Sequence, residues 1–321
     1  MSTEKLPVTV ITGFLGAGKT TLLNRILTQD HGKKYAVIIN EFGEEGIDND
    51  LVVDSDEEIF EMNNGCICCT VRGDLIRIIS TLLKRSEQLD GMIIETTGLA
   101  DPAPVVQTFF VDDDVKERVK LDAVITVVDA KHCHEHLQDS HEAEEQIAFA
   151  DVIVVNKTDL VNDSELAAVR EQIGKLNRYA KIHPVMQSNI DINKVLDCGA
   201  FDLQRILDIE PQLLEDEDDH EHDESITSVS LKTLKPLVPE KFSQWIREFI
   251  MQRGVDILRS KGILNLADQE NRYVFQGVHM VMDSSWGEPW GEKARQSRLV
   301  FIGRNLDEKA LREDFLACTQ S

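Results

Sequence analysis

Short apolar runs alternate with longer amphipathic segments along the first two thirds of the chain. The runs are rich in β-branched residues, as buried strands are, and the segments between them carry apolar residues at helical spacing. The apolar runs lie at residues 8–12, 35–39, 91–94, 123–128 and 151–155. Nearly continuous apolar strands that alternate with helices predict a mostly parallel sheet covered on both faces. We therefore expect one α/β domain over residues 5–207.

The pattern changes after residue 225. Strand-like segments lie at residues 226–234, 273–282 and 299–302. Helical spacing marks residues 240–251 and 307–317, where Pro239 precedes the first helix and Asp307 can cap the second. This order predicts a small α+β domain over residues 225–321. In it, Trp286 and Trp290 are expected on a loop, either as an anchor for a partner or as part of the small core.

A strongly acidic run separates the two parts. Residues 215–224 contain eight acidic side chains together with His220 and His222. Such a run cannot bury apolar surface, so residues 208–224 are predicted to form a solvated linker. The two histidines leave open a weak metal-collecting role for the same segment.

Charge and composition narrow the function classes. The 321 residues carry a formal net charge of −24 at 42% hydrophobic content, which is typical of a globular protein and unfavourable for binding nucleic acid or anionic lipid. No apolar run is long enough to span a bilayer, and the first residues lack a signal pattern. We therefore expect a cytoplasmic protein. Six cysteines in such a chain are expected to be thiols or metal ligands rather than disulfides.

A glycine-rich loop follows the first strand. Its sequence, Gly-Phe-Leu-Gly-Ala-Gly-Lys-Thr, stands between the strand 8–12 and a helix expected over 19–28, and this context is typical of a nucleotide-phosphate loop. Lys19 should reach the β- and γ-phosphates, and the Thr20 hydroxyl should bind Mg²⁺. The expected nucleotide-binding residues here are Gly13, Gly16, Ala17, Gly18, Lys19, Thr20 and Thr21.

A second motif, Asn156-Lys157-Thr158-Asp159, follows the strand 151–155 directly. In P-loop GTPases an Asn-Lys-x-Asp sequence at a strand end recognises guanine, because the aspartate accepts hydrogen bonds from N1–H and the 2-amino group. Adenine offers no such donor pair, and a buried carboxylate would be left unpaired beside it. GTP is therefore expected over ATP, with Asn156, Lys157 and Asp159 at the base.

Glu95 ends another buried strand and is followed by Thr96-Thr97-Gly98. A strand-end acid serves the Mg²⁺ side of related sites, so we assign Glu95 this role together with Lys19 and Thr20. The amide of Gly98 can bond the γ-phosphate. The alternative role for Glu95 is a carboxylate that caps the next helix.

Three thiols, Cys66, Cys68 and Cys69, lie within four residues and follow an Asn-Asn-Gly turn. Thiolates this close can converge on one soft ion, although a zinc ion would need a fourth ligand from elsewhere. Simple burial of some of these cysteines, or redox chemistry, are the alternatives. A histidine-rich segment from His132 to His141 leaves open both a His132–His136 metal pair and a solvated polar helix.

Together these motifs resemble the CobW-type metallochaperone GTPases, most of all the zinc-regulated GTPase metalloprotein activators. The resemblance rests on the phosphate loop, Asn40-Glu41-Phe42-Gly43-Glu44, the thiol triplet, the Glu95–Pro102 segment and the guanine motif, and two C-terminal segments, 275–279 and 298–306, extend it to the second domain.

The resemblance implies a Mg²⁺-dependent GTPase that converts GTP to GDP and phosphate. It implies a Zn²⁺ or Co²⁺ cargo at Cys66, Cys68 and Cys69, with Glu44 as an additional ligand. The partner implied is a client apo-metalloprotein that receives the metal, and a homo-oligomer that depends on nucleotide or metal stays open. A zinc buffer or sensor in which nucleotide has only a structural or regulatory part is the main alternative. A small-molecule kinase is a third, disfavoured by the guanine motif.

Overall fold

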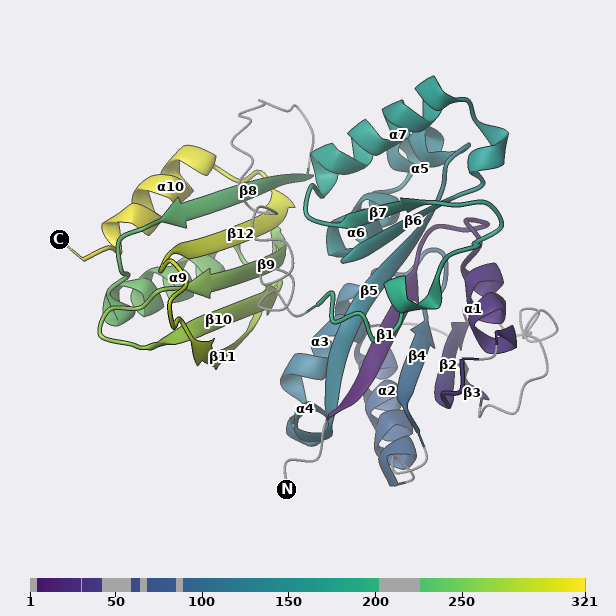
Figure 1. Cartoon of the computed structure of the whole chain (residues 1–321), viewed down its shortest axis with the longest axis horizontal. Coiled ribbons are helices and arrows are strands. Elements are labelled where there is room, and N and C mark those ends of the chain that lie inside the picture. Colours follow the sequence, from purple (N-terminus) through teal and green to yellow (C-terminus); the bar gives the residue numbers. More distant parts are fainter. Residues whose placement is uncertain are drawn as a thin grey trace. The chain divides into compact units, whose positions relative to one another are not determined.

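The computed structural model of the chain describes residues 5–29, 31–41, 59–63, 68–84, 89–201 and 226–320. The chain divides into two compact units. Among the described residues, the first comprises those up to Ile173 together with Ala180–Phe201, and the second comprises Gly174–Tyr179 and all the elements from Ile226 onward. Figure 1 shows each unit built around its own sheet. The predicted boundaries near residues 207 and 224 lie outside the described residues, as does the acidic run.

Within the described residues, the first unit contains a seven-stranded sheet in the order β3-β2-β4-β1-β5-β6-β7. All of its pairings are parallel. The strands are β1 (Leu6–Thr12), β2 (Tyr35–Glu41), β3 (Ile59–Asn63), β4 (Gly91–Glu95), β5 (Val119–Asp129), β6 (Val152–Asn156) and β7 (Lys181–Pro184). The α/β prediction with a parallel sheet is confirmed.

Helices lie between most of these strands along the chain. The α-helices of this unit are α1 (Lys19–Thr28), α2 (Cys68–Leu82), α3 (Ala103–Val111), α4 (Asp113–Arg118), α5 (Cys133–Asp139), α6 (His141–Phe149) and α7 (Asp163–Leu176). The 3-10 turns are η3 (Thr158–Leu160) and η4 (Ile192–Lys194). Because parallel strands all point the same way, the loops that follow them meet at the same edge of the sheet.

Both faces of the sheet are covered, which explains the continuous apolar runs. Strands β4 and β6 are buried at every position. On one face, Leu22 and Ile26 of α1 pack with sheet residues such as Ile11 and Val127. The segment 185–200 covers the same cluster through Val195 and its neighbours. The segment beyond β7 is thus part of the core, and it lies close to the start of α1.

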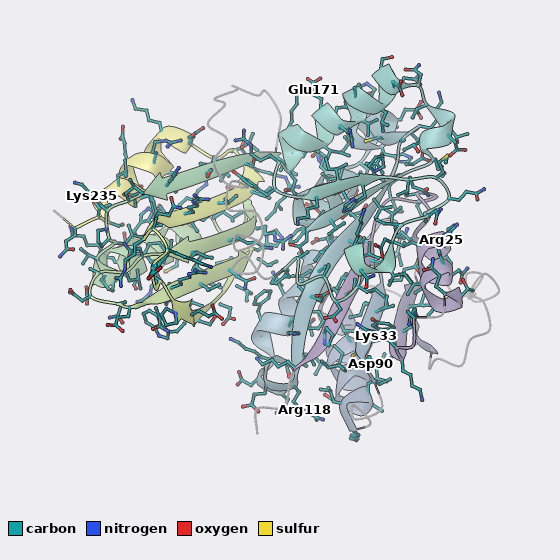
Figure 2. The ribbon with its side chains drawn as sticks, in the orientation of Figure 1. Arg25, Lys33, Asp90, Arg118, Glu171 and Lys235 are labelled. Atoms are coloured by element: carbon teal, nitrogen blue, oxygen red, sulfur yellow. The ribbon has the colours of Figure 1, made fainter. Side chains whose placement is uncertain are left out.

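Side-chain contacts fix this returning segment to α1 and β2. Arg25 donates to Asn189 Oδ1 at 2.9 Å, and Lys33 forms an ion pair with Asp197 at 3.0 Å. Figure 2 labels Arg25 and Lys33, which both lie near α1 and the start of β2. Because both contacts are exposed, they contribute little to the free energy of folding, although they define where the segment lies.

The buried carboxylate of Asp122 holds the end of the same segment. It accepts the backbone amides of Gly199 at 2.6 Å and Cys198 at 3.2 Å, while the hydroxyl of Thr9 on the neighbouring strand donates at 3.4 Å. Burial raises the pKa of Asp122, and the two backbone amides oppose that rise only in part. A backbone hydrogen bond adds to these side-chain contacts, because the Phe201 amide donates to the Asp122 carbonyl at 2.7 Å.

The second unit is an antiparallel sheet with two helices packed on it. Its strands are β8 (Ile226–Thr233), β9 (Ile257–Leu264), β10 (Asn271–Val278), β11 (Val281–Pro289) and β12 (Ser297–Arg304). Its helices are α9 (Pro239–Arg253) and α10 (Glu308–Ala317), and the strand order is β11-β10-β9-β12-β8. Phe242 of α9 and Phe315 of α10 share a core with Phe301 of the sheet. The predicted α+β fold is confirmed, and Asp307 caps α10 by accepting from the Ala310 amide at 2.9 Å.

Two local predictions in this unit were wrong. Residues 273–282 were expected to form one strand, but they span a hairpin whose pairing ends at Val278 and Val281. His279 turns the chain there with φ of 51°, and a two-residue loop of this kind connects strands tightly. Trp286 lies on β11 rather than on a loop and is 54% exposed, whereas Trp290 is buried. Strand β9, which includes Arg259, Ser260 and Lys261, was not predicted.

None of the helices in the described part of the chain combines the length and the apolar character that crossing a membrane requires.

Replacing Asp122 with Ala should destabilise the first unit by about 1–3 kcal/mol, because buried amide donors lose their acceptor. The measurement is urea unfolding at neutral pH, followed by a probe of the first unit. Asp197→Ala is the matched control, since it removes a half-exposed carboxylate from the same segment and should cost less than about 1 kcal/mol. Equal unfolding midpoints for the two variants would contradict the anchoring role of Asp122.

Candidate functional site

The phosphate-loop sequence forms the connection between β1 and α1. Gly13, Gly16 and Gly18 all have positive φ, at 137°, 71° and 109°, which favours glycine at each position. At Gly13 a Cβ would stand 2.2 Å from the Val127 carbonyl oxygen, so close packing on β5 also requires glycine there. Helix α1 begins at Lys19 without a side-chain cap. Its first amides can therefore bind an anion together with the positive end of the helix dipole.

The predicted phosphate and Mg²⁺ residues lie together at this helix start. Lys19 is 8% exposed, and its Nζ donates to the Phe14 carbonyl at 3.3 Å. The Thr20 hydroxyl donates to Glu95 Oε1 at 3.0 Å. Because β1 and β4 pair in parallel, Glu95 at the end of β4 lies beside Ile11 and thus beside the loop. Thr21 is on the exposed side of α1.

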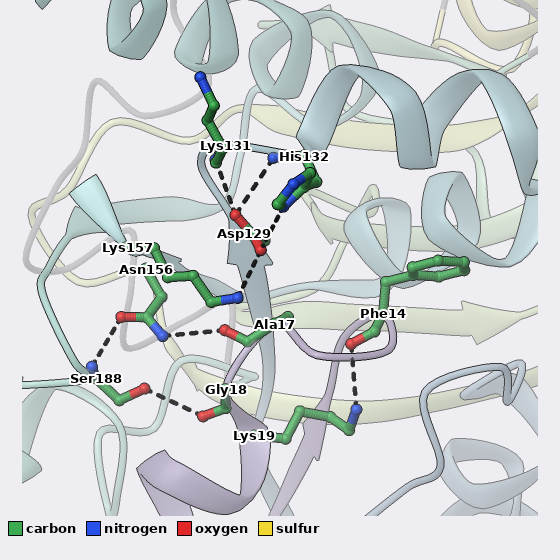
Figure 3. A network of polar contacts seen from close by, with 10 residues as sticks. All are labelled: Phe14, Ala17, Gly18, Lys19, Asp129, Lys131, His132, Asn156, Lys157 and Ser188. Carbon is green, nitrogen blue, oxygen red and sulfur yellow. Dashed lines mark hydrogen bonds and ion pairs between the residues drawn. The ribbon is translucent and has the colours of Figure 1, made fainter. Parts of the chain in front are cut away.

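Asn156 connects the base motif to the phosphate loop. It ends β6 and is buried, and its side-chain Nδ2 donates to the Ala17 carbonyl at 3.0 Å. Its Oδ1 accepts the Ser188 amide at 2.8 Å, and the Ser188 hydroxyl donates to the Gly18 carbonyl at 3.1 Å. Figure 3 shows the Asn156 side chain between Ala17 and Ser188. One amide thus joins three loops at the carboxyl edge of the sheet.

Lys157 turns away from this contact toward β5. Its backbone has φ of 60°, which is uncommon for a residue with a side chain, and its Nζ forms a 2.7 Å ion pair with Asp129 Oδ2. Asp129 also contacts His132 Nδ1 at 3.0 Å and accepts the amides of Lys131 and His132 (Figure 3). Asp129 therefore fixes Lys157, the first of the two residues between Asn156 and the expected base-binding Asp159.

The contacts of Asp129 change its titration. Burial alone would raise its pKa, but the hydrogen bonds from Lys157, His132 and the Lys131 amide, together with the charge of Lys157, hold the pKa below the usual value. The ionised carboxylate therefore stabilises the fold above the ordinary aspartate pKa of about 3.9. This contribution is lost as the pH falls through the lower pKa of the folded state.

Asp159 lies in the 3-10 turn η3 after β6, and its side chain is exposed. The turn is attached to the segment after β7, because the Thr158 hydroxyl donates to the Val185 carbonyl at 2.9 Å. The burial assumed for this carboxylate in the argument for guanine is thus not present without a base. A bound base would have to provide that burial.

Gly98 lies in a turn that touches the phosphate loop. The Ala100 amide donates to the Thr97 carbonyl at 3.2 Å, which closes the turn after Glu95. A Cβ on Gly98 would stand 2.7 Å from the Leu15 backbone nitrogen, so this turn and the phosphate loop are in close contact. The predicted phosphate-binding glycines are therefore neighbours in space.

The predicted metal ligands fall at the limit of the described structure. Glu44 and Cys66 lie outside the described residues, and for Cys68 and Cys69 only the backbone at the start of α2 is described. Within the described ranges, no cluster of three or more His, Cys, Asp or Glu side chains is arranged to hold a metal ion. The metal site at Cys66, Cys68 and Cys69, and the identity of its fourth ligand, therefore stay predictions.

The histidines of α5 contact polar and aromatic neighbours. The His136 ring packs on Phe14 of the phosphate loop at 4.4 Å between centroids, and burial lowers the pKa of His136. His134 makes contacts to Gln138 and Gln172 at 2.9 and 2.7 Å. Cys133 is buried, which raises its pKa to about 12 and makes it a weak nucleophile.

Sequence reasoning missed Ser188, Asp129 and Gln146 as parts of this site. Asp129 carried a signal, since it ends an apolar strand as Glu95 and Asn156 do. Ser188 carried none, because its left-handed backbone, with φ of 52°, depends on contacts from distant segments. Gln146 carried none either, because its partners lie 46 and 48 residues away in the chain.

A parallel sheet with a glycine loop between its first strand and first helix, and with a buried lysine and a Thr–Glu pair at the helix start, defines a P-loop nucleotide-binding domain. The chain belongs to the CobW/HypB/UreG family: the nucleotide-binding domain of that family matches residues 7–184, and the cobalamin synthesis protein cobW C-terminal domain matches residues 226–319.

Curated relatives match nearly the whole chain. The zinc chaperone YjiA of Escherichia coli is 36% identical over 97% of this chain and 98% of its own length. The zinc-regulated GTPase metalloprotein activator 1 of Schizosaccharomyces pombe is 37% identical over 94% of this chain and 83% of its own. Among solved structures, the Zn(II)-bound YjiA GTPase from E. coli has a TM-score of 0.79 at 31% identity and covers 99% of this chain and 100% of that chain.

Replacing Gly18 with Ala should weaken nucleotide binding by tenfold or more. The added Cβ would stand 2.4 Å from Asn156 Nδ2, so the bond between Asn156 and Ala17 must break or shift. The measurement is titration with a fluorescent GDP analogue. Gly32→Ala is the control, because Gly32 also has positive φ, at 65°, but its Cβ would meet nothing within 4 Å. A nucleotide affinity of Gly18→Ala equal to that of Gly32→Ala would contradict the role of the Gly18–Asn156 contact.

Proposed function

We propose that this protein is a GTP-hydrolysing metallochaperone that binds zinc at Cys66, Cys68 and Cys69 and delivers it to a client apo-metalloprotein. One observation carries the proposal: the phosphate loop, the Thr20–Glu95 pair and Asn156 form one connected site. The chain that holds this site matches a zinc chaperone over 97% of its length. Co²⁺ is the alternative cargo, since thiolates accept both ions.

The nucleotide roles follow from the geometry. GTP would place its β- and γ-phosphates at the α1 amides and Lys19, which donates to a backbone carbonyl of the same loop. The Thr20 hydroxyl and the Glu95 carboxylate, with donor and acceptor oxygens 3.0 Å apart, are hard oxygen donors of the kind Mg²⁺ requires. Bound Mg²⁺ would neutralise charge on the β- and γ-phosphates.

Chain connectivity supports a cargo site at the same edge of the sheet as the proposed nucleotide site. Residues 64–67 connect the carboxyl end of β3 to the start of α2, and β3 pairs in parallel with β2. The loops after parallel strands gather at one edge of the sheet, where the phosphate loop follows β1. This shared edge supports a coupling in which GTP strengthens zinc binding and hydrolysis weakens it.

The coupling is tested by measuring zinc affinity with a non-hydrolysable GTP analogue, with GDP and without nucleotide. We expect the tightest binding with the analogue and, by linkage, an equal factor by which zinc raises the affinity for the analogue. Cys66→Ser should abolish both effects while leaving GDP binding unchanged. Identical zinc affinity in all three states would refute the coupling.

Lys19→Ala separates the chaperone from a zinc buffer or sensor. The variant loses the charge that binds the β- and γ-phosphates, so hydrolysis should fall by at least a hundredfold while the thiols stay intact. Transfer of zinc to a client is then measured by the metal content of both proteins. A chaperone should lose transfer with hydrolysis, whereas a buffer should keep it.

Guanine recognition is tested at Asp159. In Asp159→Ala the side-chain acceptor for N1–H and the 2-amino group is lost, so GTP affinity should fall by roughly 10- to 100-fold and ATP affinity should not. Competition between GTP and ATP against a fluorescent nucleotide measures the ratio. Asp163→Ala, an exposed acid at the start of α7, is the control. An unchanged preference would place base recognition elsewhere.

A further inference from the structure

A buried glutamine holds the turn that follows Glu95. Gln146 lies on α6, is 1% exposed, and donates from Nε2 to the carbonyl oxygens of Gly98 and Ala100, both at 3.1 Å. These two carbonyls belong to the turn that the Ala100 amide closes on Thr97. Both protons of the amide therefore serve one short segment, although this segment lies 46 or more residues away in the chain.

The turn is confined on its other side by the phosphate loop. Gly98 approaches Leu15 so closely that a Cβ would stand 2.6 to 2.8 Å from three of its atoms. Gln146 itself is anchored through its backbone, since its carbonyl accepts the Thr126 hydroxyl of β5 at 2.6 Å. The turn is thus clamped between a strand-anchored helix and the loop that binds phosphate.

The orientation of the Gln146 amide leaves one of its polar atoms without a hydrogen bond within the described part of the chain. Its Oε1 is buried and has no hydrogen-bond partner among the described residues. Turning the amide over would direct that oxygen at the Gly98 and Ala100 carbonyls, which are acceptors themselves, so the orientation with Nε2 toward the turn is the one that satisfies both carbonyls. A buried acceptor left unpaired in order to satisfy two backbone carbonyls indicates that the position of the turn matters.

We propose that Gln146 is a positioning residue for γ-phosphate recognition and for hydrolysis. By holding the Gly98 carbonyl toward α6, it directs the Leu99 amide of the same trans peptide away from α6 and fixes the Thr97–Ala100 turn against the phosphate loop. The inference rests on the proposed GTPase function, because only a nucleotide with a γ-phosphate would meet this turn. Gln146 acts through the turn and touches no reacting atom.

The test compares affinities for a GTP analogue and for GDP in Gln146→Glu, together with kcat for GTP. Glutamate keeps the size of the side chain, but its carboxylate has no donor and repels both carbonyls. We expect the ratio of GTP-analogue to GDP affinity to fall about tenfold and kcat to fall at least as much. GDP affinity should change little, since GDP lacks the group that the turn would contact.

Two controls separate positioning from stability. Gln172→Glu makes the same chemical change on α7, where Gln172 contacts His134 near the surface, and should leave the ratio unchanged. Thr126→Val removes the hydroxyl that anchors α6 but keeps the side-chain amide of Gln146. Its effect on the affinity ratio therefore shows what a loss of stability alone would do. If Gln146→Glu does not fold, the same affinities and kcat are measured on Gln146→Met, whose side chain fills a similar space without hydrogen-bond donors.

The outcomes are distinct. A wild-type protein that neither prefers the GTP analogue nor hydrolyses GTP would refute the proposed function itself. A wild-type protein that hydrolyses GTP, alongside a Gln146 variant with lower stability and an unchanged affinity ratio, would overturn the positioning role alone.

Discussion

The first unit depends on the side-chain amide of Asn156 at the carboxyl edge of its sheet. This amide is both donor and acceptor, and it uses the two functions on different segments, the phosphate loop through Ala17 and the loop after β7 through Ser188. Both contacts are buried, where an unmade hydrogen bond is expensive. The expected phosphate and base sites lie on loops that follow different strands, and Asn156 joins these loops. The contacts of Asn156 hold the two loops at a fixed distance from each other. A ligand with both a base and phosphates requires such a fixed distance.

Asp129 adds a second fixed point at this edge. In the predicted base motif, Asn156 is directed at the phosphate loop, and Lys157 and Thr158 separate it from Asp159, which is expected to face a base. Lys157 accepts an uncommon backbone conformation and is held there by a 2.7 Å ion pair with a carboxylate that is itself buried. Strain at one residue is stable because a neighbouring strand end supplies several compensating contacts.

Local pattern explains which features could be predicted from the sequence. The parallel sheet, the start of α1 at Lys19 and the cap at Asp307 follow from periodicity and motif chemistry that operate within a few residues. Ser188 and Gln146 act on partners that are distant in the chain, through Gly18 and Gly98, so no local pattern marks them. The hairpin at His279 was missed for a related reason, since an apolar run continues through the turn and neither His279 nor Met280 is a typical turn residue.

Strand β5 carries a buried carboxylate near each end, and the two respond to acid in opposite ways. Asp122 lies toward the amino end with a raised pKa, so protonation relieves a charge that burial disfavours. Asp129 ends the strand with a lowered pKa, so protonation removes an ion pair that the fold uses. As the pH falls, Asp122 therefore takes up its proton first, which relieves the buried charge. Asp129 follows only at lower pH, where the edge that holds Lys157 and Asn156 loses its ion pair.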